Sequence, residues 1–199
     1  MDETSGRQQV HPPYQAFYIQ SMLFNAASAV RSVQQVNAML AAAMEGSPED
    51  PYKALYGTRF LAELQHLVVH AAALSRYFWP VGKDHRWRGD ELREVFGIAD
   101  DNPLRSRELR NAIEHFDERL DRYLADGIVG YILPEYIGPT IKTDGVPAHI
   151  FRAYYVETAS FQLLGDTHEI QPIASEVGKI YSRLVKMDKD GGTFGRGRA

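Results

Sequence analysis

Apolar residues recur three and four positions apart through the first half of the chain, which is the spacing of amphipathic helices. One such stretch covers residues 13–45 and ends at the Gly46-Ser47-Pro48 turn. A second covers residues 51–79, where the apolar positions share one face at about 100° per residue. A shorter stretch after Asp90 stops near Gly97. The pattern predicts two long helices followed by a short one.

The next stretch has clear signals at both ends. Asp101 and Asn102 can cap a helix, Pro103 suits its first turn, and Gly127 suits its end. We therefore expect a third long helix, continuous from residue 103 to residue 126. Its apolar stripe consists of Leu109, Ala112, Ile113, Phe116, Leu120, Tyr123 and Leu124.

Beyond Gly127 the helical spacing is lost. Residues 127–145 contain four Gly and two Pro, which favours a loop or short extended pieces. The segments HIFRAYYVE and SFQLLG are rich in aromatic and branched residues and predict a β-hairpin, with THEIQ as a third short strand. Residues 172–187 have helical spacing again. The fold expected is mainly α, a helical bundle of three or four long helices with a small C-terminal β-hairpin element.

The length of 199 residues favours one domain. We expect a disordered arm over residues 1–12, a single helical domain over 13–187 with a hairpin insertion at about 148–170, and a flexible Gly-rich tail over 188–199. Hydrophobic residues make up 44% of the chain and charged residues 24%, which is typical of a globular protein.

Composition excludes several classes of protein. The chain has no cysteine, so it has neither a disulfide framework nor a thiolate zinc site. No apolar run reaches the ~18 residues of a membrane span, and the polar start MDETSGRQQVHPP is unlike a secretory signal. These features predict a cytoplasmic protein that does not engage a membrane. A net charge of −4 argues against tight, sequence-independent nucleic-acid binding, although it leaves room for brief, local contact with RNA.

The segment with the most suggestive chemistry is the polar face of the third predicted helix. Arg110 and Glu114 are four residues apart and can touch, as can Asn111 and His115. One interpretation is a solvated face of ion pairs, each contributing a few tenths of a kcal/mol.

The order of residues in this segment favours a second interpretation. The sequence RNAIEH has the form R-N-x-x-x-H, which resembles the motif of the HEPN superfamily, the higher-eukaryote and prokaryote nucleotide-binding helical domains. The family pattern is Arg, four to six residues, then His, often with a polar residue directly after the Arg. The flanking LRSRELRNAIEHFDERLD is also similar to uncharacterised bacterial members. The resemblance covers residues 13–126 and leaves the hairpin and the last helix unexplained.

The resemblance implies a metal-independent endoribonuclease, of a toxin or antiphage type, with an RNA substrate, a possible antitoxin partner and no cofactor. His115 would be the general acid/base, because imidazole exchanges protons near neutral pH. Arg110 would bind phosphate oxygens through its planar guanidinium. Asn111 would orient the imidazole or the substrate, while Arg107 and Glu114 would support the site.

Helical geometry adds an expectation about assembly. Arg110 and His115 are five residues apart, about 140° around a helix, so one helix directs them to opposite sides. Two copies related by a two-fold axis would place the Arg of each near the His of the other. We therefore expect a homodimer with a composite site. The alternative is a non-catalytic HEPN-like module that uses this face to hold a partner or a nucleotide.

Two other clusters deserve weighing. One cluster consists of Glu63, His66 and His70 and contains the motif E-x-x-H. The chain has no second E-x-x-H to complete a di-iron site and no H-E-x-x-H sequence for zinc, so no metal is expected. The segment KDHRWRG, residues 83–89, combines cations with Trp87 as in single-strand RNA sites, although a surface loop is the simpler interpretation. Gly-rich phosphate loops are absent from the sequence, so nucleotide cofactors have no support.

Overall fold

The computed structural model describes residues 8–46, 52–56, 59–142 and 144–195. Within them the chain forms six α-helices, three short 3₁₀ turns and one four-stranded sheet. The helices are α1 (Pro12–Gly46), α2 (Phe60–Phe78), α3 (Arg86–Phe96), α4 (Glu108–Glu114), α5 (Phe116–Ala125) and α6 (Gln171–Lys189). The strands are β1 (Tyr131–Gly138), β2 (Ala148–Tyr155), β3 (Ser160–Leu163) and β4 (Asp166–Glu169). The 3₁₀ turns are Lys53–Leu55, Lys83–His85 and Pro103–Arg105.

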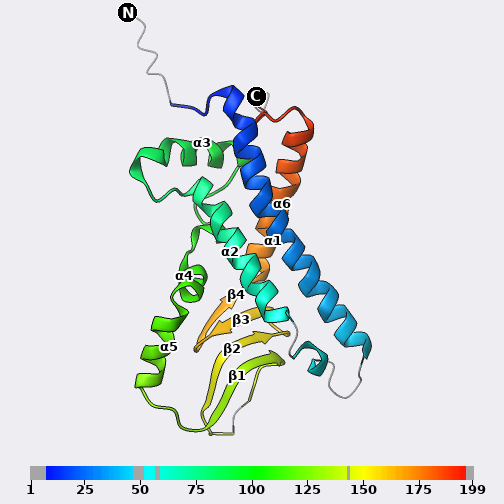
Figure 1. Cartoon of the computed structure of the whole chain (residues 1–199), viewed down its shortest axis with the longest axis vertical. Coiled ribbons are helices and arrows are strands. Elements are labelled where there is room, and N and C mark those ends of the chain that lie inside the picture. Colours follow the sequence, from blue (N-terminus) through cyan, green and yellow to red (C-terminus); the bar gives the residue numbers. More distant parts are fainter. Residues whose placement is uncertain (1–7, 47–51, 57–58, 143, 196–199) are drawn as a thin grey trace, which may run out of the picture.

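Three helices form the main helical layer, in which α1 packs against both α2 and α6 (Figure 1). The periodic apolar residues face one shared core, as predicted, and its largest fully buried side chains include Phe60, Phe78 and Leu184. The prediction for residues 13–45 is confirmed by α1. The stretch 51–79 forms a helix only from Phe60 onward, and its described earlier part holds a 3₁₀ turn.

The sheet lies at one end of the molecule and has the order β1-β2-β3-β4 (Figure 1). β1 is parallel to β2, whereas β3 is antiparallel both to β2 and to β4. The sheet joins the helical core where the Tyr154 ring of β2 meets the Phe60 ring of α2, with the ring centroids 5.1 Å apart. The predicted strands correspond to β2, β3 and β4.

The expected fold class, a bundle of three or four long helices with a small C-terminal hairpin, is wrong. The chain builds a four-stranded mixed sheet, and residues 127–145, for which a loop or short extended pieces were expected, contribute the eight-residue strand β1. Pro134 interrupts the strand pattern, but it is tolerated because β1 is an edge strand. Nine residues separate the end of β1 from the start of β2, and nine extended residues can span about 30 Å, which exceeds the length of about 26 Å of an eight-residue strand.

The prediction of one continuous helix over residues 103–126 is also wrong. Pro103–Arg105 is a 3₁₀ turn, capped by the Asn102 side chain as expected, and α4 and α5 are separated at His115. The backbone of His115, with φ −113° and ψ 34°, departs from helical values. The bend follows from packing, because α4 contacts α2 while α5 lies against the sheet.

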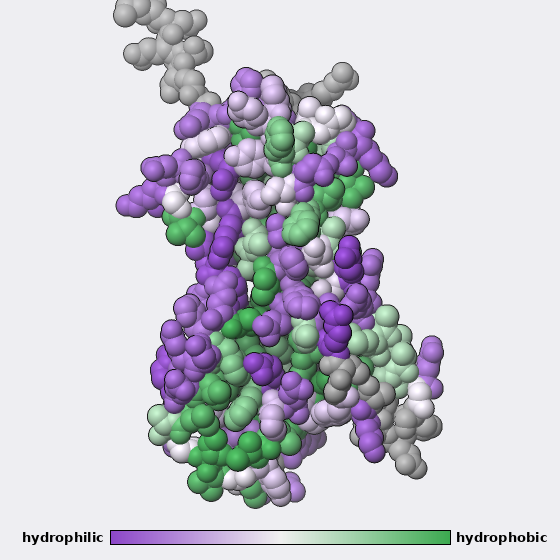
Figure 2. Space-filling view, in the orientation of Figure 1, coloured by the Kyte–Doolittle hydropathy of each residue, from purple (hydrophilic) through white to green (hydrophobic). Residues whose placement is uncertain are grey.

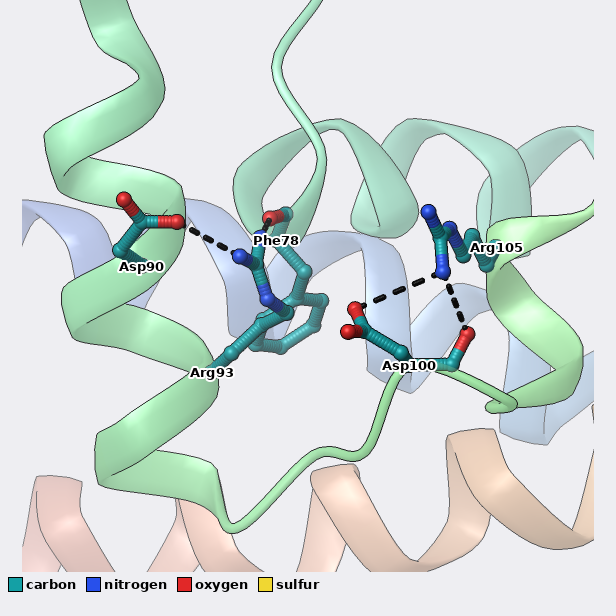
Figure 3. A network of polar contacts seen from close by, with 5 residues as sticks. All are labelled: Phe78, Asp90, Arg93, Asp100 and Arg105. Atoms are coloured by element: carbon teal, nitrogen blue, oxygen red, sulfur yellow. Dashed lines mark hydrogen bonds and ion pairs between the residues drawn. The ribbon is translucent and has the colours of Figure 1, made fainter.

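Two paired arginines lie on either side of the connection between α3 and α4 (Figure 3). Arg93 donates to the Phe78 carbonyl at the end of α2 and to Asp90. Arg105 donates to the Asp100 carbonyl, 2.9 Å away, and lies 3.5 Å from the Asp100 carboxylate. The first contact holds α3 against the end of α2, and the second closes the segment that leads to α4.

The segments expected to be a disordered arm and a flexible tail contain packed residues in their described parts. Val10 is buried and its N–H donates to Glu91 of α3. Phe194 is buried and its N–H donates to Gln15 of α1. Residues 1–7 and 196–199 lie outside the described residues. Among the helices described, none is both long and apolar enough to cross a membrane.

Candidate functional site

Arg110 lies on α4 and its side chain is largely buried against α2, with 14% of it exposed. It lines a narrow crevice together with Ala72 of α2 and Leu104. Its guanidinium donates through Nε and Nη2 to Asn111 Oδ1, at 3.1 and 2.5 Å. Nε also lies 3.4 Å from Glu114 Oε2, so the predicted pair at i,i+4 is confirmed. Arg110 is thus held by both of its polar neighbours on α4.

Glu114 is shared by a second arginine that the sequence analysis did not identify. Arg76 Nη2, from the last turn of α2, lies 3.8 Å from Glu114 Oε1. Its side chain is 54% exposed, against 14% for Arg110. The pairing reflects the contact between α2 and α4, which no local sequence pattern specifies. Two cations therefore converge on one carboxylate, and Arg76 is the more accessible of them.

His115 stands at the bend between α4 and α5, where its side chain is 56% exposed. Its Nδ1 lies 3.6 Å from Glu118 Oε1, beyond hydrogen-bond distance. Its backbone carries the chain across the bend, with its N–H donating to Asn111 and its carbonyl accepting from Arg119. Within the described part of the chain, no polar contact joins the imidazole to Arg110 or Asn111. The expected orienting contact from Asn111 is replaced by the bonds of Asn111 to Arg110.

Arg107, predicted to support the site, contacts the end of α2. Its Nη2 donates to the Trp79 carbonyl, 2.7 Å away. This bond satisfies a carbonyl just beyond the last turn of α2 and ties α4 to that helix. The arrangement gives Arg107 a role in placing α4.

Glu63, the carboxylate of the E-x-x-H step, is buried and paired. It accepts from Ser32 Oγ at 2.8 Å and lies 2.9 Å from Arg59 Nη2, while His66 Nδ1 is 3.5 Å away. Burial lowers the pKa of His70, and the nearby His66 lowers it further. Glu63 therefore links α1 to α2, and the described residues contain no group of three or more side chains placed to hold a metal.

The basic and aromatic residues of KDHRWRG do not form an open stacking surface. Trp87 is half-buried against the core. The Arg88 guanidinium stacks over the rings of Tyr18 and Tyr77, at 5.9 and 5.8 Å from their centroids. These contacts hold α3 against α1 and α2.

A second histidine lies near the sheet-facing side of α4 and α5. His168 of β4 has a buried Nε2 with no hydrogen-bond partner among the described residues, and burial lowers its pKa against the opposing effects of Asp166 and Glu108. Arg119 of α5 pairs with Asp166 at 2.8 Å. No local sequence pattern predicts this cluster, because it depends on how β4 packs against the bent helix.

Exposed apolar side chains gather where α5 leads into β1. They cover the lower end of the molecule in Figure 2, where green predominates. The large apolar side chains exposed there are Leu124, Val129, Tyr131 and Ile132.

Comparison of the chain with protein-family models, curated proteins and solved structures finds no match.

Proposed function

We propose that this chain is a HEPN-like, metal-independent endoribonuclease of the cytoplasm, with an active site completed by a second copy. The observation that carries the proposal is the exposed imidazole of His115, at a helix bend directly after Glu114, on which two arginines converge. An imidazole and a guanidinium group that meet the substrate are the two kinds of group that this cleavage needs, and Arg76, at 54% exposed, is the accessible guanidinium.

The reaction is attack of the ribose 2′-oxygen on the adjacent phosphorus. The bond from phosphorus to the 5′-oxygen breaks, a 2′,3′-cyclic phosphate forms, and the 5′-oxygen takes up a proton. His115 would accept the 2′-OH proton or donate to the leaving oxygen, because imidazole serves either role near neutral pH.

Arg76 and Arg110 would stabilise the charge on the phosphoryl oxygens. In the free chain Glu114 balances both cations, at 3.8 and 3.4 Å. An incoming phosphate would compete with this carboxylate for the guanidinium groups. Arg76 meets solvent more readily, so it would contact the substrate first.

A second copy enters the proposal because Arg110 and His115 diverge on one chain. Pairing of two α4–α5 segments about a two-fold axis would bring the arginines of each copy to the His115 of the other. An enzyme of this kind acting as a toxin would be restrained by an antitoxin protein that covers the same face.

The second candidate function is non-catalytic binding of a partner or a nucleotide on this face. It is favoured by the state of Arg110, which is already bonded to Asn111 and paired with Glu114. Such a guanidinium is well placed to hold the helix in shape and less well placed to meet a substrate.

Incubation of the purified protein with a long, folded RNA in EDTA, across pH 6 to 8, separates the two functions. We expect the wild type to cut and to leave 2′,3′-cyclic phosphate ends, and His115→Ala to lose activity by about 100-fold or more. His85→Ala is the matched control, because His85 is exposed on the 3₁₀ turn before α3. Absence of cleavage by the wild type at every pH would refute the nuclease and leave the binding module.

A further inference from the structure

The outer face of α1 is uncharged to an unusual degree for an exposed helix. Arg31 and Glu45 are the only charged residues among its 35 positions, whereas six of the 11 positions of α3 are charged. Three aromatic side chains stand exposed on this face: Tyr14, Phe17 and Phe24, at 60%, 74% and 69%. A long solvent-facing helix normally carries charges on its outer side.

The exposed residues of α1 follow a regular spacing. Positions alternately three and four apart are all exposed or half-exposed, and this is the spacing of helices that pair side by side. We call this set the α1 stripe. It consists of Tyr14, Phe17, Ser21, Phe24, Ser28, Arg31, Gln35, Ala38 and Ala42.

From these observations we infer that the α1 stripe binds the α1 stripe of a second copy, with the two helices antiparallel. The bulky aromatic residues lie in the N-terminal half of the stripe, and the C-terminal half ends in alanines. An antiparallel pair centred near Ala26 sets Phe24 against Ser28 of the second copy, and Phe17 against its Gln35. Tyr14 then meets Ala38 of the second copy. A parallel pair would instead crowd the aromatic residues together and leave the alanine halves apart.

Three polar side chains on or beside the α1 stripe, those of Ser21, Asn25 and Ser28, are already bonded within the chain. Ser28 Oγ donates to the Phe24 carbonyl at 2.8 Å, and Asn25 Nδ2 donates to the Ser21 carbonyl at 3.1 Å. Ser21 Oγ is bonded to the Tyr77 hydroxyl of α2. Because these groups are already satisfied within the chain, removing water from them costs little.

The size of the contact indicates a dimer that depends on concentration. Overlap of residues 12–40 gives a contact about 43 Å long, and a helix about 10 Å wide then buries about 450 Å² on each copy. The total of about 900 Å² lies below the usual size of a stable interface and fits a weak one. His70, whose ring borders Phe24, and Tyr77 add area along the α2 side.

This interface is separate from the proposed active site. α1 packs on α2 and α6, while α4 packs on another part of α2, so a copy bound to the α1 stripe does not by itself complete the site around His115. If both contacts form about two-fold axes that are perpendicular and intersect, the assembly closes as a tetramer.

Cysteine cross-linking tests the inference, since the natural chain has no cysteine. In the antiparallel pair the two copies of residue 28 are offset by about 6 Å along the axis, while those of residue 42 are about 48 Å apart. Ser28→Cys should therefore form a cross-linked dimer with a short bismaleimide, and Ala42→Cys, on the same stripe, should not. Equal cross-linking of both variants, or none at Ser28, overturns the antiparallel pair.

Introducing two charges into the α1 stripe supplies a second, independent measurement. The variant for this measurement carries Phe17→Asp and Phe24→Asp and keeps Ser28. Its association through this face, measured by analytical ultracentrifugation, should be at least about 100-fold weaker, because each copy would bury two carboxylates. Both positions are exposed, so the thermal unfolding temperature should stay unchanged. RNA cleavage should also be retained, which separates failure of this inference from failure of the proposed nuclease. Association equal to that of the wild type would overturn the inference.

Discussion

Replacing Ser32 by alanine is a sharp test of how α1 is held to α2. Both Ser32 and Glu63 are buried, and Ser32 Oγ donates to Glu63 Oε2 at 2.8 Å across the two helices. Ser32→Ala removes this donor and leaves a buried carboxylate with only Arg59 and the more distant His66. A hydrogen bond to a charged group is worth about 1.5–3 kcal/mol.

Alanine also favours the helix by up to about 0.5 kcal/mol relative to serine, which offsets part of that loss. The expected net loss in free energy of unfolding is therefore about 1–2.5 kcal/mol. For a chain of this length, each kcal/mol lowers Tm by about 2–4 °C, so the expected fall is about 2–10 °C. Thermal and urea unfolding followed by far-UV circular dichroism measure both quantities.

Ser182→Ala is the matched control for this experiment. Ser182 is exposed on α6 and its Oγ bonds only the Gly178 carbonyl of its own helix, 3.0 Å away. Its replacement should change the free energy of unfolding by less than about 0.5 kcal/mol. If Ser32→Ala is as stable as Ser182→Ala, the bond between Ser32 and Glu63 does not contribute to stability and the reasoning fails.

Three further predictions concern the backbone, pH and the arginine cluster. Gly89→Ala should destabilise the protein strongly, because a Cβ there would lie 2.7 Å from the Phe78 carbonyl oxygen. Gly178→Ala, where a Cβ would meet open space, should raise the free energy of unfolding by up to about 1 kcal/mol; urea unfolding measures both variants. The lowered pKa of His168 means that the unfolded chain binds its proton more readily. Stability should therefore fall as the pH drops below about 6.5, and His168→Gln should flatten that fall in melts recorded from pH 5 to 8; an unchanged slope would contradict the assignment. Glu114→Gln removes the carboxylate shared by the two arginines, so the protein should bind single-stranded RNA more tightly in fluorescence anisotropy, and Glu135→Gln, exposed on β1, should not change binding.

Local periodicity was sufficient to predict the helices of the main layer. α1 and α6 form where apolar residues repeat at helical spacing between Pro and Gly signals. The residues of each packing face are only three or four positions apart, so a local pattern is enough to predict them. β1 was missed because both of its faces are partly exposed and Pro134 breaks its pattern, while its partner β2 lies in a separate segment. Parallel pairing leaves no turn between strands for a local pattern to detect.

The candidate site was predictable only within one helix. The pair Arg110–Glu114 follows from residues four apart, and the structure contains it. The bend at His115 depends on α5 turning toward the sheet, where the Arg152 guanidinium lies 4.1 Å from the centre of the Phe116 ring. The contact of Arg76 with Glu114 likewise depends on tertiary packing, so no pattern within α4 could show it.

Subunit complementation tests the central claim most directly, namely that the arginine of one copy acts with the histidine of another. Arg110→Ala and His115→Ala are each expected to be inactive in RNA cleavage. After mixing in equal amounts and exchange of subunits, half of the dimers are mixed and each holds one intact site, so activity should return to about a quarter of the wild-type value. Failure of the mixture to recover activity, while each variant remains folded and exchanges subunits, would contradict a composite site.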